Sequence, residues 1–335
     1  MTAEKENSLN RLKRDILPVL SQEIADVLCR VDIGRLEQLE EIRLRADKPL
    51  MLQNYRNEWF VMADGSLGTT SGKAVIVTQK GISRTLELMS ENSIYAFQEE
   101  IKNGYLTIRG GHRIGIVGRV VYDGNSIKNI KDISGLNIRL SNQIIGCAEK
   151  MMKHLIKGKS SICNTLLISP PQCGKTTLLR DIARGLSDGI PALEFKGIKV
   201  GIVDERSEIA ACYKGVPQNN VGMRTDVLDG CLKSMGMIMM IRSMSPDVII
   251  TDEIGCEGDR DAVLGALNAG VKIITTAHGY NISELKSRRE VLKLLEDNVF
   301  ERYIVLGNSK GPGTLVEVVD GTTMKTVAGE GYHDN

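Results

Sequence analysis

A glycine, a lysine and a threonine at residues 174–176 are the first place where residue types and spacing point to chemistry. A lysine in such a loop reaches the β- and γ-phosphates of a nucleotide, and the glycine leaves room for the anion. The full pattern, G-x-x-x-x-G-K-[ST], has a glycine where this chain has Ser169. Three matching residues arise by chance in roughly one chain of this length in six, so the interpretation depends on the surrounding elements.

The residues around this loop predict a strand, a turn and a helix. An apolar run ends at Ser169, and a helical pattern begins at Thr176. The free amides and partial positive charge of a helix N-terminus favour a bound phosphate. We expect Lys175 to bind the phosphates and Thr176 to ligate Mg²⁺. The expected nucleotide-binding residues are Pro170, Pro171, Gln172, Cys173, Gly174, Lys175, Thr176 and Thr177.

A second candidate group follows another apolar run, at the end of the sequence "SPDVIITDE" (245–253). A parallel strand would deliver Asp252 and Glu253 to the same edge of a sheet as the phosphate loop. Asp252 would hold Mg²⁺ through water, and Glu253 would polarise the attacking water as general base. The alternative is an acidic pair that merely begins a loop.

Two further strand ends carry polar side chains. Glu205 stands in the charged cluster that follows "KVGIVD" (199–204), and His278 ends the run "VKIITTAH" (271–278). Glu205 would order the metal or the water, or else form a surface ion pair. His278 would sense the γ-phosphate or position water, or else be a hydrogen-bonded loop residue. Both alternatives stay open at this point.

The elements that must position these residues read as an α/β domain. Continuous apolar runs of strand length alternate with helical segments from Thr165 onward, which indicates a mostly parallel sheet covered on both faces. Residues 301–306 and 314–320 read as a terminal hairpin. A strand between the phosphate loop and the acidic pair favours the P-loop branch that hydrolyses ATP with a strand-borne glutamate. We place this domain at residues 141–335.

Residues 1–140 predict a smaller α+β domain. Apolar residues recur at helical spacing from Leu9 to Val31, and Thr78 is placed to cap a helix through Met89. Short strand-like runs with glycines at their turns follow at 104–108, 113–121 and 136–140. The methionine-rich run at 235–244, in the second domain, predicts a core-facing helix.

Composition excludes several classes. The 335 residues carry a formal net charge of +1 and few aromatic residues (4%), which argues against a nucleic-acid-tracking surface. Seven cysteines without a CxxC pair suit a reducing compartment. No apolar run approaches the roughly 20 residues of a membrane span, and the N-terminus lacks the apolar core of a signal peptide. We expect a cytoplasmic protein without a transmembrane segment.

The motifs, taken in order, resemble those of the stage III sporulation protein AA family of spore-forming bacteria. The matching segments are "PPQCGKTTLLRDIAR" (170–184), "VGIVDERSEIA" (200–210), "MIRSMSPDVIITDEIG" (240–255), "ITTAHG" (274–279), "EIRLRADKPL" (41–50) and "ISGLNIRLSNQIIGCA" (133–148). More distantly, the chain is similar to the ATPases of type II and type IV secretion systems and to pilus motors.

The resemblance implies a RecA-like P-loop ATPase domain in a hexameric ring. It places the nucleotide on residues 174–177, the catalytic glutamate at Glu253, and Glu205 and His278 in the acidic and histidine boxes. The secretion ATPases usually have glycine where this chain has Asp252. The family further implies a mother-cell ATPase that works with membrane-embedded channel proteins between mother cell and forespore.

Arginines often complete the sites of such rings, where a guanidinium from a neighbouring subunit neutralises transition-state charge. The candidates, each of which has an ordinary surface or ion-pair role as its alternative, are Arg113, Arg119, Arg139, Arg224 and Arg242.

The function predicted from these residues is an oligomeric ATP-hydrolysing motor, with ATP and Mg²⁺ as ligands, on a membrane-associated sporulation channel. One alternative is a P-loop ATPase that remodels nucleic acid. Another is a nucleotide-switched scaffold without useful turnover. A small-molecule kinase is disfavoured because no separate acceptor-binding lid is evident.

Overall fold

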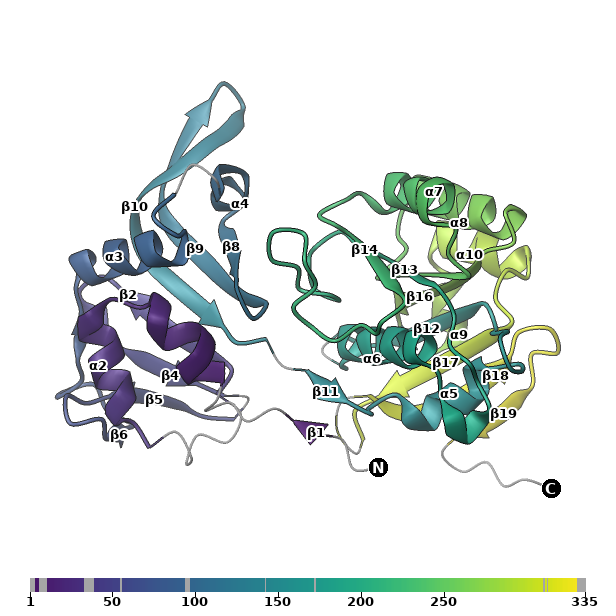
Figure 1. The fold of residues 1–335 in the computed structure, drawn as a ribbon, viewed down its shortest axis with the longest axis horizontal. Coiled ribbons are helices and arrows are strands. Elements are labelled where there is room, and N and C mark those ends of the chain that lie inside the picture. The colour runs from purple at the N-terminus through teal and green to yellow at the C-terminus, as the bar shows by residue number, and fades with distance from the viewer. Residues whose placement is uncertain are drawn as a thin grey trace. The chain divides into compact units, whose positions relative to one another are not determined.

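The structure of the protein is a computed structural model that describes residues 4–5, 11–32, 39–54, 56–93, 97–141, 143–171, 173–309, 311 and 313–329. The chain divides into two compact units between Gln143 and Ile144, and Glu4 belongs with the second (Figure 1). Among the described residues, no helix has the length and apolar character that a bilayer crossing requires.

The N-terminal unit is built on an antiparallel sheet with the strand order β6-β5-β4-β2-β10-β9-β8. Its elements are η1 (Leu12–Ile16), η2 (Leu17–Val19), α2 (Gln22–Arg30), β2 (Glu41–Arg45), β3 (Lys48–Pro49), β4 (Met51–Gln53), β5 (Glu58–Val61), β6 (Leu67–Gly68), β7 (Ile76–Val77), α3 (Gln79–Met89), α4 (Gln98–Lys102), β8 (Tyr105–Ile108), β9 (His112–Asp123) and β10 (Ser126–Arg139). A short strand, β1 (Glu4–Lys5), pairs with β11 (Ile144–Ile145).

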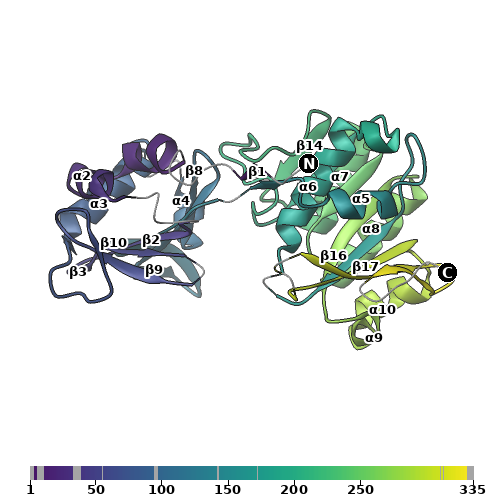
Figure 2. The ribbon, with the colours of Figure 1, turned by 90° about the horizontal axis from the view of Figure 1, so that it is seen from below.

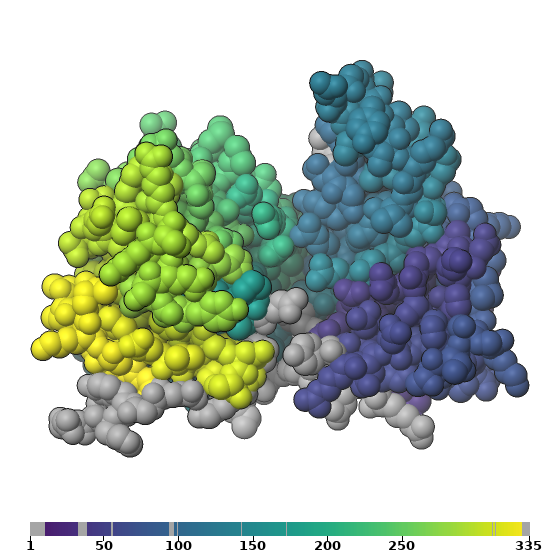
Figure 3. Space-filling model, turned by 180° about the vertical axis from the view of Figure 1, so that it is seen from behind, coloured from purple at the N-terminus to yellow at the C-terminus, as the bar shows by residue number. Residues whose placement is uncertain are grey.

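Local signals explain the helices of this unit. The Thr78 hydroxyl accepts a hydrogen bond from the Gly81 amide at 2.9 Å, so the predicted cap of α3 is confirmed. The helical pattern near the N-terminus is not one helix, because Pro18 lies in the short 3-10 turn that separates Leu12–Ile16 from α2. The far half of the β9–β10 ribbon extends beyond the rest of the unit (Figures 1 and 3).

The C-terminal unit contains an eight-stranded sheet with the order β14-β13-β15-β16-β12-β17-β18-β19, parallel as far as β17 and antiparallel beyond it. Its elements are α5 (Glu149–Leu155), β12 (Thr165–Ser169), α6 (Lys175–Asp188), η5 (Pro191–Leu193), β13 (Val200–Asp204), β14 (Thr225–Asp229), α7 (Lys233–Met244), β15 (Val248–Thr251), α8 (Glu257–Asn268), β16 (Lys272–His278), α9 (Ile282–Leu285), α10 (Arg289–Glu296), β17 (Arg302–Gly307), β18 (Thr314–Asp320) and β19 (Thr326–Gly329). The predicted hairpin is confirmed as β17–β18.

Helices cover both faces of this sheet, as the apolar strands predict (Figures 1 and 2). On one face, α5 and α6 pack on strand residues such as Leu167 and Ile202. On the other face, α7, α8 and α10 pack on residues such as Ile168 and Ile249. Neighbouring residues of one strand therefore enter opposite cores, which requires strands that are apolar on both sides.

The methionine-rich helix α7 faces the core, as predicted, but with one side only. Met237 and Met240 are buried against the sheet, but Met235, Met239 and Met244 are exposed. The helix therefore turns only one face to the core. A run that is apolar on all sides does not indicate which face that will be.

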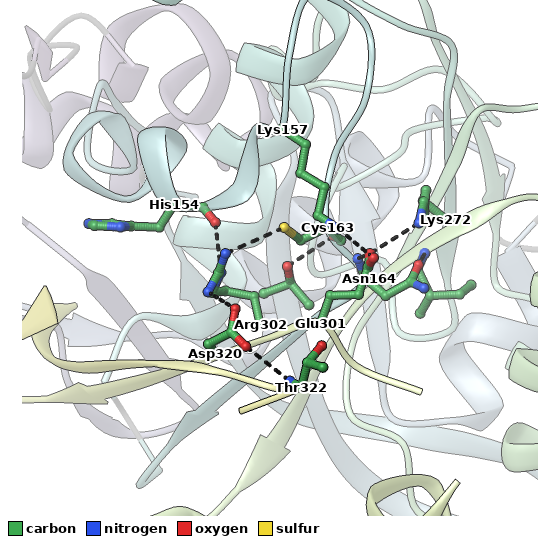
Figure 4. A network of polar contacts seen from close by, with 11 residues as sticks. His154, Lys157, Cys163, Asn164, Lys272, Glu301, Arg302, Asp320 and Thr322 are labelled. Atoms are coloured by element: carbon green, nitrogen blue, oxygen red, sulfur yellow. Dashed lines mark hydrogen bonds and ion pairs between the residues drawn. The ribbon is translucent and has the colours of Figure 1, made fainter. Parts of the chain in front are cut away.

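A polar network fixes the amino-terminal edge of the same sheet (Figure 4). Glu301 accepts hydrogen bonds from Lys157, Lys272 and the Asn164 amide, while Arg302 pairs with Asp320. Burial alone would raise the pKa of Glu301, but these donors outweigh burial and lower it to about 2. The network ties β12, β16 and β17 together at the edge opposite Ser169 and His278.

Candidate active site at the carboxyl edge of the parallel sheet

Four strand ends bring the predicted site residues to one edge. Ser169 ends β12 and lies in register with His278, which ends β16. Asp252 directly follows β15, and Glu205 directly follows β13. In the sequence, β13 lies between the phosphate loop and the acidic pair. In the folded sheet, the strand between them is β16, which lies between β12 and β15.

The turn after β12 explains why Ser169 fits where glycine is usual. Ser169 is fully buried, and its hydroxyl donates to the carbonyl of Pro170 at 2.9 Å. Its own carbonyl accepts from the Gly279 amide at 3.2 Å. Gly174 is the position that does need glycine, because its φ of 75° lies in the left-handed region at the start of α6. Gln172 lies outside the described residues.

Lys175 points back across this turn. Its Nζ lies 3.3 Å from the carbonyl of Ser169, 3.4 Å from that of Pro170 and 2.6 Å from Nδ1 of His278. Burial lowers the pKa of Lys175, and the negative charge of Glu253 opposes this effect. A half-buried ammonium held by neutral acceptors is a strong attractor for an anion.

His278 connects this lysine to Glu253. With Nδ1 accepting from Lys175, the ring proton sits on Nε2, which lies 3.1 Å from Oε2 of Glu253. The other carboxylate oxygen of Glu253, Oε1, lies 3.1 Å from NH1 of Arg288. Lys175, His278, Glu253 and Arg288 thus form one continuous chain of polar contacts.

A second cluster lies at the ends of β13 and β15, around Lys233. Its Nζ lies 2.6 Å from Oε2 of Glu205 and 3.2 Å from Oδ1 of Asp252. Burial alone would lower the pKa of Lys233, but its hydrogen bond to Glu205 and the charge of Asp252 outweigh burial and raise that pKa. Burial raises the pKa of Asp252, with Lys233 opposing. Despite this proximity, Oδ1 of Asp252 is buried without a well-formed hydrogen bond among the described residues.

Asp204 organises the loop that carries Glu205. Its carboxylate accepts the backbone amides of Glu208, Ile209 and Ala210 at 2.8–2.9 Å. Arg180 of α6 donates to the carbonyls of Ile209 and Glu208, at 2.6 and 2.8 Å. The helix that begins at Lys175 is therefore tied to the loop after β13.

The predicted site residues fall in these two groups and the loop beside them. Lys175, His278 and Glu253 are joined in one chain, while Glu205 and Asp252 share Lys233. Thr176 and Thr177 begin α6, Cys173 is buried, and Pro170 and Pro171 form the turn. The sequence around Lys233 and Arg288 does not mark either residue as part of a site. Arg288, for example, stands in the mostly charged segment 286–290.

The candidate arginines have the following contacts. Arg113 lies over the ring of Tyr105 at 4.0 Å, Arg119 pairs with Asp132 at 2.7 Å, Arg139 pairs with Glu41 at 3.3 Å, Arg224 donates to the carbonyl of Ser187 at 2.6 Å, and Arg242 is exposed. Arg224 thus holds α6 to the segment before β14. These contacts are what ordinary structural roles predict.

Comparison with known proteins identifies the family. Residues 10–325 match the family described as "Sporulation stage III, protein AA". The chain belongs to the stage III sporulation protein AA family. Stage III sporulation protein AA of Bacillus subtilis (strain 168) is 42% identical over 310 residues, which cover 91% of this chain and 94% of that protein. The family resemblance predicted from the motifs is therefore confirmed.

Solved structures confirm the fold of this family member. The ATPase DotB of Legionella pneumophila has a TM-score of 0.55 at 12% identity, covering 84% of this chain and 77% of that one. The pilus retraction motor PilT, with bound ADP, has a TM-score of 0.53 at 15% identity, covering 91% and 82%. The chain is thus an α/β protein that shares its fold with these two ATPases, with a mostly parallel sheet in its C-terminal part, preceded by a smaller α+β part. At these identities the likeness concerns the fold alone.

Proposed function

We propose that this chain hydrolyses ATP at the carboxyl edge of the parallel sheet and that residues 141–335 form the ATPase domain. The observation that carries the proposal is the contact chain from Lys175 through His278 to Glu253. It links a phosphate-binding cation to a carboxylate that can accept a proton from water. The pilus retraction motor, which has a similar fold, was solved with bound ADP, and this supports a nucleotide as the ligand of this chain.

The loop residues would hold the triphosphate. The amides at the start of α6 and the side chain of Lys175 would bind the phosphates, with Gly174 leaving space for them. Lys175 would then exchange its contacts with Ser169, Pro170 and His278 for phosphate oxygens. Residues 170–177, Gln172 and Cys173 included, would line the nucleotide.

The residues present fit a magnesium ion. Oδ1 of Asp252, a buried oxygen without a well-formed hydrogen bond, would hold Mg²⁺ through water, and Thr176 would supply a hydroxyl ligand. Among the described residues no group of three or more His, Cys, Asp and Glu side chains is arranged to hold a metal. Mg²⁺ would neutralise the charge that develops on the phosphates.

Glu253 would act as the general base, with His278 orienting it. Glu205, held by Lys233, would help order the water or metal from the neighbouring strand end. Both glutamates lie at strand ends rather than on long loops, which favours precise placement of the attacking water.

At the level of the whole protein, we propose a homo-oligomeric ring, hexameric as in the secretion ATPases it resembles. Residues 1–140 would transmit the movement, and an arginine from a neighbouring subunit would complete the site. The motor would act from the mother-cell cytoplasm on membrane-embedded channel proteins of sporulation. The family assignment and the secretion-ATPase fold support this proposal.

Phosphate release tests whether the site hydrolyses ATP or only binds it. Glu253→Gln removes the general base and should lower kcat by about a hundredfold or more at saturating ATP and Mg²⁺. Glu257→Gln is the matched control, because the side chain of Glu257 is 71% exposed and only four residues away. Equal, negligible rates for wild type and Glu253→Gln would favour a nucleotide-switched scaffold instead.

A further inference from the structure

Arg288 lies at a fixed joint between two helices. Its amide donates to the carbonyl of Leu285 in α9 at 3.0 Å, and its carbonyl accepts from Leu292 in α10 at 2.8 Å. Leu285 and Leu294 of these helices are fully buried. The backbone of Arg288 is therefore held by packed elements rather than by a free loop.

An ion pair anchors α10 further. NH1 of Arg260 in α8 lies 2.8 Å from Oε2 of Glu290, and the two side chains are only 14% and 16% exposed. Because this pair joins α8 to the first turn of α10, it restricts movement of Arg288 relative to the sheet.

The guanidinium of Arg288 reaches the carboxylate that we propose as general base. NH1 lies 3.1 Å from Oε1 of Glu253, while His278 holds the other oxygen at 3.1 Å. The charge of Arg288 also helps to lower the pKa of Lys175, so its field extends to the phosphate loop. Glu253 is thus held from both sides, by the end of β16 and by the start of α10.

We propose that Arg288 is a positioning residue for the hydrolysis proposed above, on which this inference rests. When phosphate draws Lys175 away from His278, Arg288 remains as a fixed cation on Glu253. It keeps that carboxylate oriented toward the attacking water. An arginine suits this role because its guanidinium stays charged and its donors have a fixed geometry.

The ordinary alternative is a surface ion pair without a role in the reaction. The side chains of Arg288 and Glu253 are 39% and 37% exposed, and pairs of this exposure make a modest but measurable contribution to stability. The two explanations differ in whether replacing Arg288 lowers the rate of hydrolysis, and in whether that effect requires Glu253.

Steady-state kinetics separate them. Arg288→Ala should lower kcat by about tenfold to a hundredfold while KM changes by less than about twofold, because orientation and not nucleotide binding is lost. Arg288→Lys should recover part of kcat. Arg289→Ala is the matched control, since the neighbouring side chain is 85% exposed, and it should match wild type. If Arg288→Ala and Arg289→Ala had the same kcat, the proposal would be overturned.

A double-mutant comparison tests whether Arg288 acts through Glu253. In single-turnover measurements on Glu253→Gln protein, adding Arg288→Ala should reduce the residual rate by less than about twofold. An equal loss in both backgrounds would overturn the proposal, because a purely structural role gives independent losses.

A readout without turnover keeps the inference separate from the proposed function. In a cycle of thermal unfolding measurements, Arg288→Ala and Glu253→Gln should be coupled, whereas Arg289→Ala and Glu253→Gln should be additive. Absence of coupling would overturn the role of Arg288. Wild-type protein that releases no phosphate, with this coupling intact, would contradict the proposed hydrolysis and leave the contact standing.

Discussion

At the scale of single residues, the carboxyl edge shows which chemistry a sequence reveals and which it hides. Lys175 is predictable from the glycine-lysine-threonine motif, and Glu253 and His278 are predictable because each stands at the end of an apolar run. Lys233, which pairs with Asp252, and Arg288, which pairs with Glu253, are not predictable, because each meets its carboxylate only after the chain has folded. A charged residue on a helix usually indicates a solvated face.

Asp204 carries a testable pH dependence. Its side chain is fully buried, and burial raises its pKa to about 6 from an ordinary value of 3.8. The folded protein therefore binds this proton more tightly than the unfolded chain, so stability falls as pH rises from about 4 to about 6. The shift corresponds to on the order of 3 kcal/mol.

The Asp204→Asn variant should not show this fall in stability between about pH 4 and about pH 6, because asparagine does not titrate. Urea unfolding followed by circular dichroism at pH 4 to 7 should show wild type losing about 3 kcal/mol relative to the variant as pH rises. Curves that stay parallel across this range would show that Asp204 does not titrate there.

At the scale of elements, the period and length of apolar runs predicted the core of the sheet. β12, β13, β15, β16 and the β17–β18 hairpin all lie where apolar runs placed them. β14 was not predicted, because two of the five residues in its sequence TDVLD are acidic and it lies at the edge of the sheet. The order of the strands in the sheet could not be predicted from the sequence either. The crossover connections decide which parallel strands become neighbours, and the local residue pattern does not show this.

Two helical glycines make a matched test of how closely α7 packs. A Cβ on Gly236 would lie 2.5 Å from a methyl group of Val203 in β13, whereas a Cβ on Gly265 of α8 would meet nothing within 4 Å. Gly236→Ala should destabilise the protein by about 1–3 kcal/mol. Gly265→Ala should stabilise it by about 0.5–1 kcal/mol through helix propensity. Similar unfolding free energies for both variants would contradict the close contact of α7 with β13.

At the scale of the whole molecule, the proposed motor requires that nucleotide and assembly be linked. In this proposal the C-terminal fold would supply the site, and a ring would supply the arginine that completes it from a neighbouring subunit. Ligands that bind the assembled form more tightly than the free subunit shift the equilibrium toward assembly.

Mass measurement tests that link. Glu253→Gln protein with ATP and Mg²⁺ should shift to a defined multiple of the 36.8 kDa chain, while Lys175→Ala under the same conditions should not respond to ATP. A monomer at every protein and nucleotide concentration would contradict an arginine acting across subunits.

The most direct test of the central claim is the identity of the nucleotide recovered from the protein after incubation with ATP and Mg²⁺. Wild type should yield ADP, Glu253→Gln should yield intact ATP, and Lys175→Ala should yield neither, because each removes a different step at one site. Intact ATP on both wild type and Glu253→Gln would contradict hydrolysis. Undiminished nucleotide on Lys175→Ala would contradict the assignment of the site to this edge of the sheet.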